Sequence, residues 1–218
     1  MSEVPPHREG ELAFFGRMGA HVSHEMRNVL SIIGEYAGLL ADLLEAAEAG
    51  RPLDSERLKQ LSRNIAGQVA KGTETMQRFS RFAHAADQQT ASLDLTALVE
   101  DLVALAQRHA TRAGCTLKTQ LPNEAIAVTG NPFRLQHLVF SAIELLLAAL
   151  ENGESVTVRL HAEGSTAVVT MLGKAPITTD EWSARVSQLS AAANESKAVL
   201  DTSCTEGILS LTLAIPIQ

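Results

Sequence analysis

The residues of this chain that are best suited to chemistry lie close together, in and just before the run SHEMRN. His24 carries an imidazole, and a neutral imidazole is a nucleophile that can attack a phosphoryl group. Glu25 could orient the ring or take its proton, and Asn28 could hydrogen-bond a phosphoryl oxygen or an attacking water. Arg17 and Arg27 could screen phosphate charge. The run therefore predicts phosphoryl chemistry centred on His24.

A metal site and an ordinary surface histidine are alternative interpretations of the same run. His21 and His24 are three residues apart and share a helical flank with Glu25. The zinc-binding pattern His-Glu-x-x-His would need a second histidine at position 28, where the chain has Asn28. We therefore expect no metal site. A single exposed histidine on a polar helix face commonly has no function, and the residues alone leave that interpretation open.

A seven-residue repeat of apolar residues indicates a long helix from about residue 11 to residue 48, after a loose tail at 1–10. At about 100° per residue, His24 points about 180° away from the seam between Val22 and Met26, so we expect its side chain to be exposed. Two files of residues form that seam: Phe15, Val22, Val29, Tyr36 and Leu43, and Gly19, Met26, Ile33, Leu40 and Ala47.

A second helix is expected from about Ser55 to Ala85, after the helix-breaking segment 50–54. The two helices would form an antiparallel hairpin over residues 11–86. Ile32 and Leu39 lie beside the seam and add apolar surface that one partner helix cannot cover. We therefore expect a homodimer whose two hairpins form a four-helix bundle.

The remainder of the chain, residues 92–218 after a polar linker at 87–91, predicts a two-layer α+β domain with helices on one face of a mixed sheet. The expected helices are 95–113, 132–150 and 179–194, and the expected strands are 115–121, 125–129, 156–161, 167–172, 198–202 and 208–215.

The composition limits the classes of protein that fit. Hydrophobic residues make up 45% and aromatic residues 4%, and the formal net charge is −7. The negative charge argues against general binding to nucleic acid or to an anionic membrane. No apolar run approaches the ~20 residues that span a bilayer, and the N-terminus lacks the pattern of a signal peptide. With only two cysteines, we expect a reduced, cytoplasmic protein.

Several segments carry a resemblance to a known family. The segment from Phe15 to Leu40, centred on VSHEMRN, resembles the phosphoacceptor box of the two-component sensor histidine kinases. Other segments resemble the end of that family's dimerisation hairpin and the start and last strand of its ATP-binding domain: residues 76–82, 93–95, 130–138 and 209–216. The resemblance covers nearly the whole chain from residue 11. It implies that His24 is the phosphoacceptor and that an ATPase-like domain follows the hairpin.

The chain departs from this family where the family holds nucleotide. The metal-holding asparagine should fall near Leu145, and no asparagine lies between positions 133 and 150. The adenine-binding Asp-x-Gly-x-Gly is replaced by Met171–Ala175, and no glycine lies between Gly173 and Gly207 for the second phosphate loop. We therefore expect a degenerate domain that binds neither ATP nor any other cofactor. Val29 also replaces the usual proline after Asn28, so the helix should run straighter.

The resemblance and its departures together favour a dimeric histidine phosphotransferase of a phosphorelay. His24 would accept phosphate from an aspartate of one response-regulator receiver domain and pass it to another receiver. The receiver would supply its own Mg²⁺. A hybrid histidine kinase is a further candidate partner, and nucleic acid and membranes are not expected partners.

Three other functions remain open. A response-regulator phosphatase would use Glu25 and Asn28, at the family's Glu-x-x-Asn spacing, to position a hydrolytic water on phospho-aspartate. A non-catalytic pseudokinase adaptor would bind a kinase or receiver and do no chemistry. An ordinary kinase that phosphorylates itself would need a nucleotide site elsewhere in the chain, and we expect no such activity.

Overall fold

The computed structural model describes residues 6–217, and it describes side chains from residue 10 onward. The chain divides into two compact units. One comprises Gly19–Ser80, the larger part of a helical hairpin, which we call the hairpin unit. The other joins the residues up to Met18 with those from Arg81 onward, and we call it the α/β unit. None of the described helices is long and apolar enough to cross a membrane.

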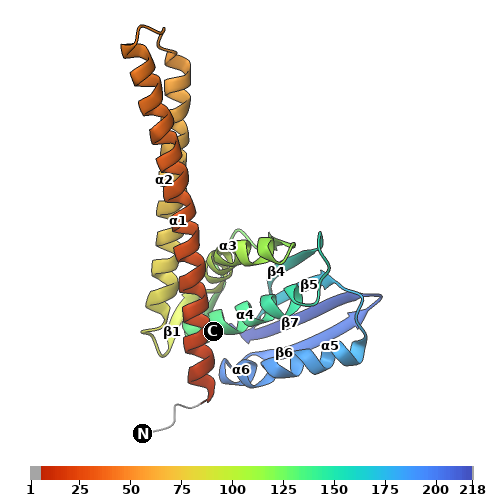
Figure 1. Cartoon of the computed structure of the whole chain (residues 1–218). Coiled ribbons are helices and arrows are strands. Elements are labelled where there is room, and N and C mark those ends of the chain that lie inside the picture. The colour runs from red at the N-terminus through yellow and green to blue at the C-terminus, as the bar shows by residue number, and fades with distance from the viewer. Residues whose placement is uncertain (1–5, 218) are drawn as a thin grey trace. The chain divides into compact units, whose positions relative to one another are not determined.

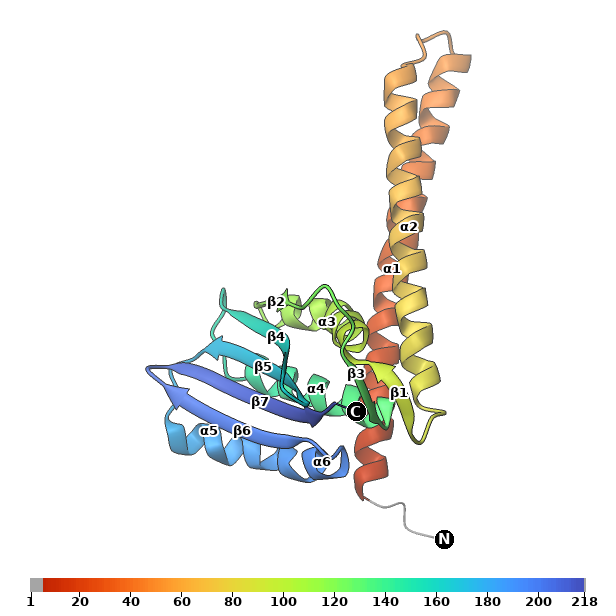
Figure 2. The same ribbon diagram turned by 180° about the vertical axis from the view of Figure 1, so that it is seen from behind.

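Two long helices form the hairpin, as the apolar repeat predicts: α1 (Pro6–Glu48) and α2 (Ser55–Ala85). They run side by side in opposite directions (Figures 1 and 2). The turn follows from its residues. Gly50 takes a φ of +86°, which suits a residue without a Cβ just after a helix end. The Asp54 carboxylate then accepts hydrogen bonds of 3.1 Å from the backbone N–H groups of Glu56 and Arg57 and caps α2.

The first helix begins earlier than the sequence predicted. Residues 6–10 were expected to be part of a loose tail, but α1 already starts at Pro6; residues 1–5 of that tail lie outside the described part of the chain. Proline is favoured in the first turn of a helix because its fixed φ fits and its missing N–H would have no helical partner there. Within the α/β unit, Glu11 accepts a 3.2 Å hydrogen bond from Arg134, which ties this end of α1 down.

The apolar seam of α1 is also displaced in its first turns. Val22 and Val29 are buried as expected, but Phe14 is completely buried whereas Phe15 is 36% exposed. Phe14 packs in an aromatic cluster of the α/β unit, where its ring centroid lies 5.3 Å from that of Phe82. A seven-residue repeat drifts around a helix of 3.6 residues per turn, so the packing partner decides which phenylalanine faces inward. Phe15 still stacks on Phe82 of α2 with ring centroids 5.7 Å apart, so both phenylalanines contact α2 and Phe14 is the more deeply buried of the two.

The α/β unit contains a five-stranded sheet of order β2-β4-β5-β7-β6 and a separate pair, β1-β3. β2 runs parallel to β4, and the other neighbours are antiparallel. The strands are β1 (Ala91–Asp94), β2 (Thr116–Gln120), β3 (Ala127–Gly130), β4 (Ser155–Glu163), β5 (Thr166–Lys174), β6 (Val199–Thr205) and β7 (Ile208–Pro216). The prediction missed β1 because it is short and lies in a polar stretch; it forms by pairing with β3.

The helices of this unit lie on one face of the sheet (Figures 1 and 2), which confirms the predicted two-layer α+β fold. They are α3 (Leu95–Arg112), α4 (Pro132–Leu147), α5 (Thr179–Val186) and α6 (Ser190–Glu195), with a 3₁₀ turn, η1 (Ser187–Leu189), before α6. Asp94 and Asn131 cap α3 and α4 through their side chains. The core lies between this layer and the buried face of the sheet.

The segment 179–194 was predicted as one helix but is interrupted. The Ser187 hydroxyl donates a 2.6 Å hydrogen bond to the carbonyl of Ala184, and such local bonds compete with helical backbone pairing. Thr178 and Glu181 form a capping box that starts α5 in the expected place. Trp182, on this helix, is completely buried.

Candidate functional site

His24 lies on α1 within the hairpin unit, and its side chain is exposed, as the helical geometry predicted. The residues on the opposite side of the helix are buried: Val22 is 5% exposed and Val29 is 1% exposed. Val29 lies next to Gly72 of α2, so the same packing that forms the hairpin turns His24 outward. An exposed imidazole on a rigid helix is accessible to a phosphoryl donor on another protein.

Glu25 follows His24 but points to a different side of the helix. Its Oε1 lies 2.6 Å from Nζ of Lys71 on α2, and its side chain is only 20% exposed whereas that of Lys71 is 53% exposed. The ion pair joins the two helices at the level of His24. Lys71 was not among the candidate residues, because a contact between two helices depends on how they pack and not on a local sequence pattern.

Gly72 brings the helices close together beside this ion pair. A Cβ at Gly72 would lie 3.1 Å from Cγ1 of Val29 and 3.4 Å from Cε of Met26, which is tight packing. A glycine at this position allows the backbones to approach more closely than a larger residue would. The close approach lies at the level of the candidate site.

Asn28 and Arg27 are also exposed on α1. Asn28 is four residues after His24, and this spacing places both on the same face of the helix. Its amide can therefore reach a group bound at or near His24. Arg27 offers a positive charge on the neighbouring face.

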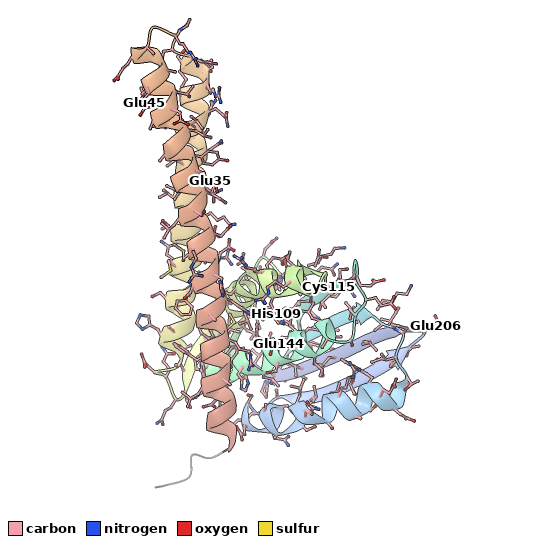
Figure 3. All side chains as sticks on the ribbon, in the orientation of Figure 1. Glu35, Glu45, His109, Cys115, Glu144 and Glu206 are labelled. Atoms are coloured by element: carbon pink, nitrogen blue, oxygen red, sulfur yellow. The ribbon has the colours of Figure 1, made fainter. Side chains whose placement is uncertain are left out.

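Arg17 belongs to the α/β unit and has a partner there. Its Nη2 donates a 3.2 Å hydrogen bond to Oε2 of Glu144 on α4, and Oε1 of Glu144 lies 3.8 Å from Nε2 of His109 on α3. Figure 3 labels His109 and Glu144, which lie next to each other on these two helices. The structure thus places Arg17 in a cluster with Glu144 and His109. The sequence did not predict these contacts.

The structure describes the surroundings of the positions at which the resemblance led us to expect nucleotide-holding residues. Leu145 stands on α4 where the metal-holding asparagine would be needed. Leu150 packs against Gly173, because a Cβ at that glycine would lie 2.7 Å from Cδ1 of Leu150. The indole of Trp182 is buried and donates a 3.4 Å hydrogen bond to the carbonyl of Ser210. The side chains of Leu145, Leu150 and Trp182 are aliphatic or aromatic, and none of them carries a carboxylate or an amide.

The described residues also hold no group of three or more His, Cys, Asp or Glu side chains that could bind a metal ion. His21, which the metal interpretation would require, is half-buried on α1.

Comparisons with known proteins agree with this fold. No protein-family model matches the chain. The C4-dicarboxylate transport sensor protein DctS of Rhodobacter capsulatus is 21% identical over 173 residues, which are 78% of this chain and 26% of DctS. The chain therefore spans about a quarter of the length of this curated relative.

Two solved structures show the same arrangement of elements. Histidine kinase AdeS of Acinetobacter baumannii matches with a TM-score of 0.50 and 14% identity, over 84% of this chain and 95% of AdeS. Histidine kinase ThkA, in its complex with the response regulator protein TrrA, matches with a TM-score of 0.53 and 16% identity, over 97% of this chain and 64% of the ThkA chain. The chain thus has the fold of a histidine kinase core, a helical hairpin followed by an ATPase-like α/β domain.

Proposed function

We propose that this chain is a two-component signalling protein in which His24 carries a phosphoryl group between response regulators. The single observation that supports this best is the exposed histidine on a histidine-kinase-like hairpin, followed by a domain whose residues do not fit a nucleotide. A phosphoryl group would then have to come from another protein rather than from ATP bound by this chain.

The bond changes at His24 need no nucleotide bound by this chain. A lone pair of the neutral His24 ring attacks the phosphorus of an aspartyl phosphate, the P–O bond to the aspartate breaks, and the aspartate leaves as a carboxylate. The ring keeps its N–H and becomes a phosphorylated imidazolium. Attack by the aspartate of a second receiver reverses these steps. The contribution of this chain is mainly positioning and charge compensation, and any Mg²⁺ would be held by the receiver.

Response-regulator receiver domains are the partners that this chemistry requires. ThkA, which shares the fold, has been solved in complex with the response regulator protein TrrA. A hybrid histidine kinase, which carries a receiver domain of its own, could supply the phosphoryl group in the same way.

We also propose that two copies of the chain form a four-helix bundle through their hairpins. Large apolar side chains remain exposed on the hairpin unit: Leu30 (62%), Leu39 (41%), Leu44 (47%), Val69 (51%) and Met76 (44%). Exposed apolar residues in this number favour contact with a further helical pair.

The test is the appearance of acid-labile phosphate on His24. Purified chain is incubated with labelled ATP alone, and separately with a panel of receiver domains that have been phosphorylated by labelled acetyl phosphate. We expect label only from receivers and none on His24→Gln, with His161→Gln, an exposed histidine on β4, as the matched control. Label from ATP alone would show a kinase, and equal labelling of His24→Gln would remove His24 from the reaction.

Phosphatase activity is the second candidate function, and the exposure of Asn28 on the face of His24 supports it. In that reaction a water positioned by Asn28 attacks the aspartyl phosphate, and no phosphohistidine forms. Receivers would then lose label without any appearing on this chain, and Asn28→Ala would slow the loss by roughly 10²-fold or more whereas His24→Gln would not. If receivers bind but neither lose nor transfer label, the chain is a non-catalytic adaptor.

A further inference from the structure

A lysine from the second helix is part of the site around His24. Nζ of Lys71 on α2 lies 2.6 Å from Oε1 of Glu25, the residue that follows His24. We propose that Lys71 is a further positioning residue for phosphoryl transfer: it holds the Glu25 carboxylate against α2 and cancels its charge. The inference rests on the proposed function, because it concerns the same transfer at His24.

The packing of the hairpin explains why a lysine at this position reaches the first helix. Gly72, the next residue, is buried against Val29 and Met26. A Cβ at position 72 would force these two side chains to shift. This close approach shortens the distance that the Lys71 side chain must span. Glu25 in turn is only 20% exposed, so its carboxylate is directed toward α2 and not toward the open face that carries His24.

The negative charge of Glu25 next to His24 makes a compensating positive charge useful for the transfer. The phosphoryl group arrives with a double negative charge, and the carboxylate of Glu25 next to its target would repel it. An ammonium in direct contact with that carboxylate removes most of the repulsion. Arg17 is paired with Glu144 in the α/β unit, and Lys71 is in contact with Glu25 itself. Lys71 gives up no proton and forms no bond during the reaction, so its role is positioning and charge compensation.

The first experiment compares Lys71→Met with Lys59→Met. Lys59 lies on the same helix and pairs with Glu56 at 2.8 Å, so its substitution removes an equivalent surface ion pair away from His24. Labelled phosphate is followed onto His24 from two donors, a receiver domain that labels the wild type and the small donor phosphoramidate. We expect roughly tenfold slower labelling for Lys71→Met at low salt, from lost charge compensation, an unchanged rate for Lys59→Met, and partial recovery in Lys71→Arg.

Two further measurements separate charge compensation from a merely structural contact. Because the Debye length falls from about 10 Å at 0.1 M salt to about 3 Å at 1 M, the deficit of Lys71→Met should shrink as salt rises. Removing the repelling charge as well, in the double variant Glu25→Gln with Lys71→Met, should restore much of the rate. Melting temperatures of Lys59→Met and Lys71→Arg should stay close to that of the wild type, because the first removes an exposed ion pair and the second keeps the positive charge.

The outcomes separate this inference from the proposed function. If the wild type takes label and Lys71→Met labels equally fast, Lys71 has no role and the phosphotransfer proposal stands. If the double variant is as slow as Lys71→Met, or if the deficit does not change with salt, charge compensation is wrong. If the wild type takes label from neither donor, the proposed function fails and this inference fails with it.

Discussion

At the scale of single residues, two histidines of this chain differ in burial. His24 is exposed on the polar face of α1 and is accessible to a donor. His137 on α4 is largely enclosed in the α/β unit, where its ring stacks on Phe14 with centroids 5.0 Å apart. Burial lowers the pKa of His137 below its ordinary value of 6.5, and the positive charge of Arg17 lowers it further, against the opposing effect of Glu11 and Glu195.

His137 should therefore make the protein less stable in acid. The folded chain keeps this ring neutral, whereas the unfolded chain takes up a proton as the pH falls through about 6.5. Acidification thus favours the unfolded state, and the stability that His137 contributes above this pH is lost below it. We expect the melting temperature to fall between pH 7.5 and pH 5.5, and to fall less in His137→Gln. His161→Gln, which changes an exposed histidine, should keep the wild-type pH dependence.

At the scale of the helices, Gly67 and Gly72 of α2 differ in how closely they are packed. Gly72 is buried, and a Cβ there would press on Val29 and Met26. Gly67, one and a half turns earlier, is exposed and has nothing within 4 Å of a Cβ position. Glycine lowers the stability of a helix interior, so only the close packing of the hairpin explains its use at position 72.

Replacing these glycines with leucine should have opposite effects on stability. Gly72→Leu overfills the space between the helices and should lower the free energy of unfolding by about 1–3 kcal/mol. Gly67→Leu adds a good helix former on an exposed face and should raise it by up to about 1 kcal/mol. Urea denaturation followed by far-UV circular dichroism measures both. Equal stability of the two variants would mean that the helices are not closely packed at Gly72.

At the scale of the whole molecule, the exposed apolar residues of the hairpin unit predict self-association. Leu30 on α1 is 62% exposed and Val69 on α2 is 51% exposed, which is costly for an isolated hairpin. We expect the wild type to sediment with twice the mass of one chain. The double variant Leu30→Glu with Val69→Glu should sediment as a monomer, because it would bury uncompensated charges in the bundle.

Ile208 on β7, which is 50% exposed, provides the control for this experiment. Ile208→Glu adds one negative charge per chain to an exposed site of the α/β unit and should leave the dimer intact. A wild type that sediments as a monomer, or a double variant that remains dimeric, would show that these hairpin residues do not form the interface.

The amino-acid sequence by itself determined the order and type of most elements, because apolar periodicity and capping residues are local properties of the chain. It placed α1, α2 and the two-layer α+β domain, and it predicted that His24 would be exposed. It also led to the prediction of degenerate nucleotide positions, because the lack of an Asn or Gly can be read without any structure.

Tertiary structure alone decided which residues meet. The choice of Phe14 over Phe15 depends on the aromatic cluster of the α/β unit, and the strand β1 depends on pairing with β3. The contacts of Lys71 with Glu25 and of Arg17 with Glu144 join residues that are 46 and 127 positions apart. No local pattern encodes such contacts, because they depend on how the packed helices set the distance and rotation between their faces.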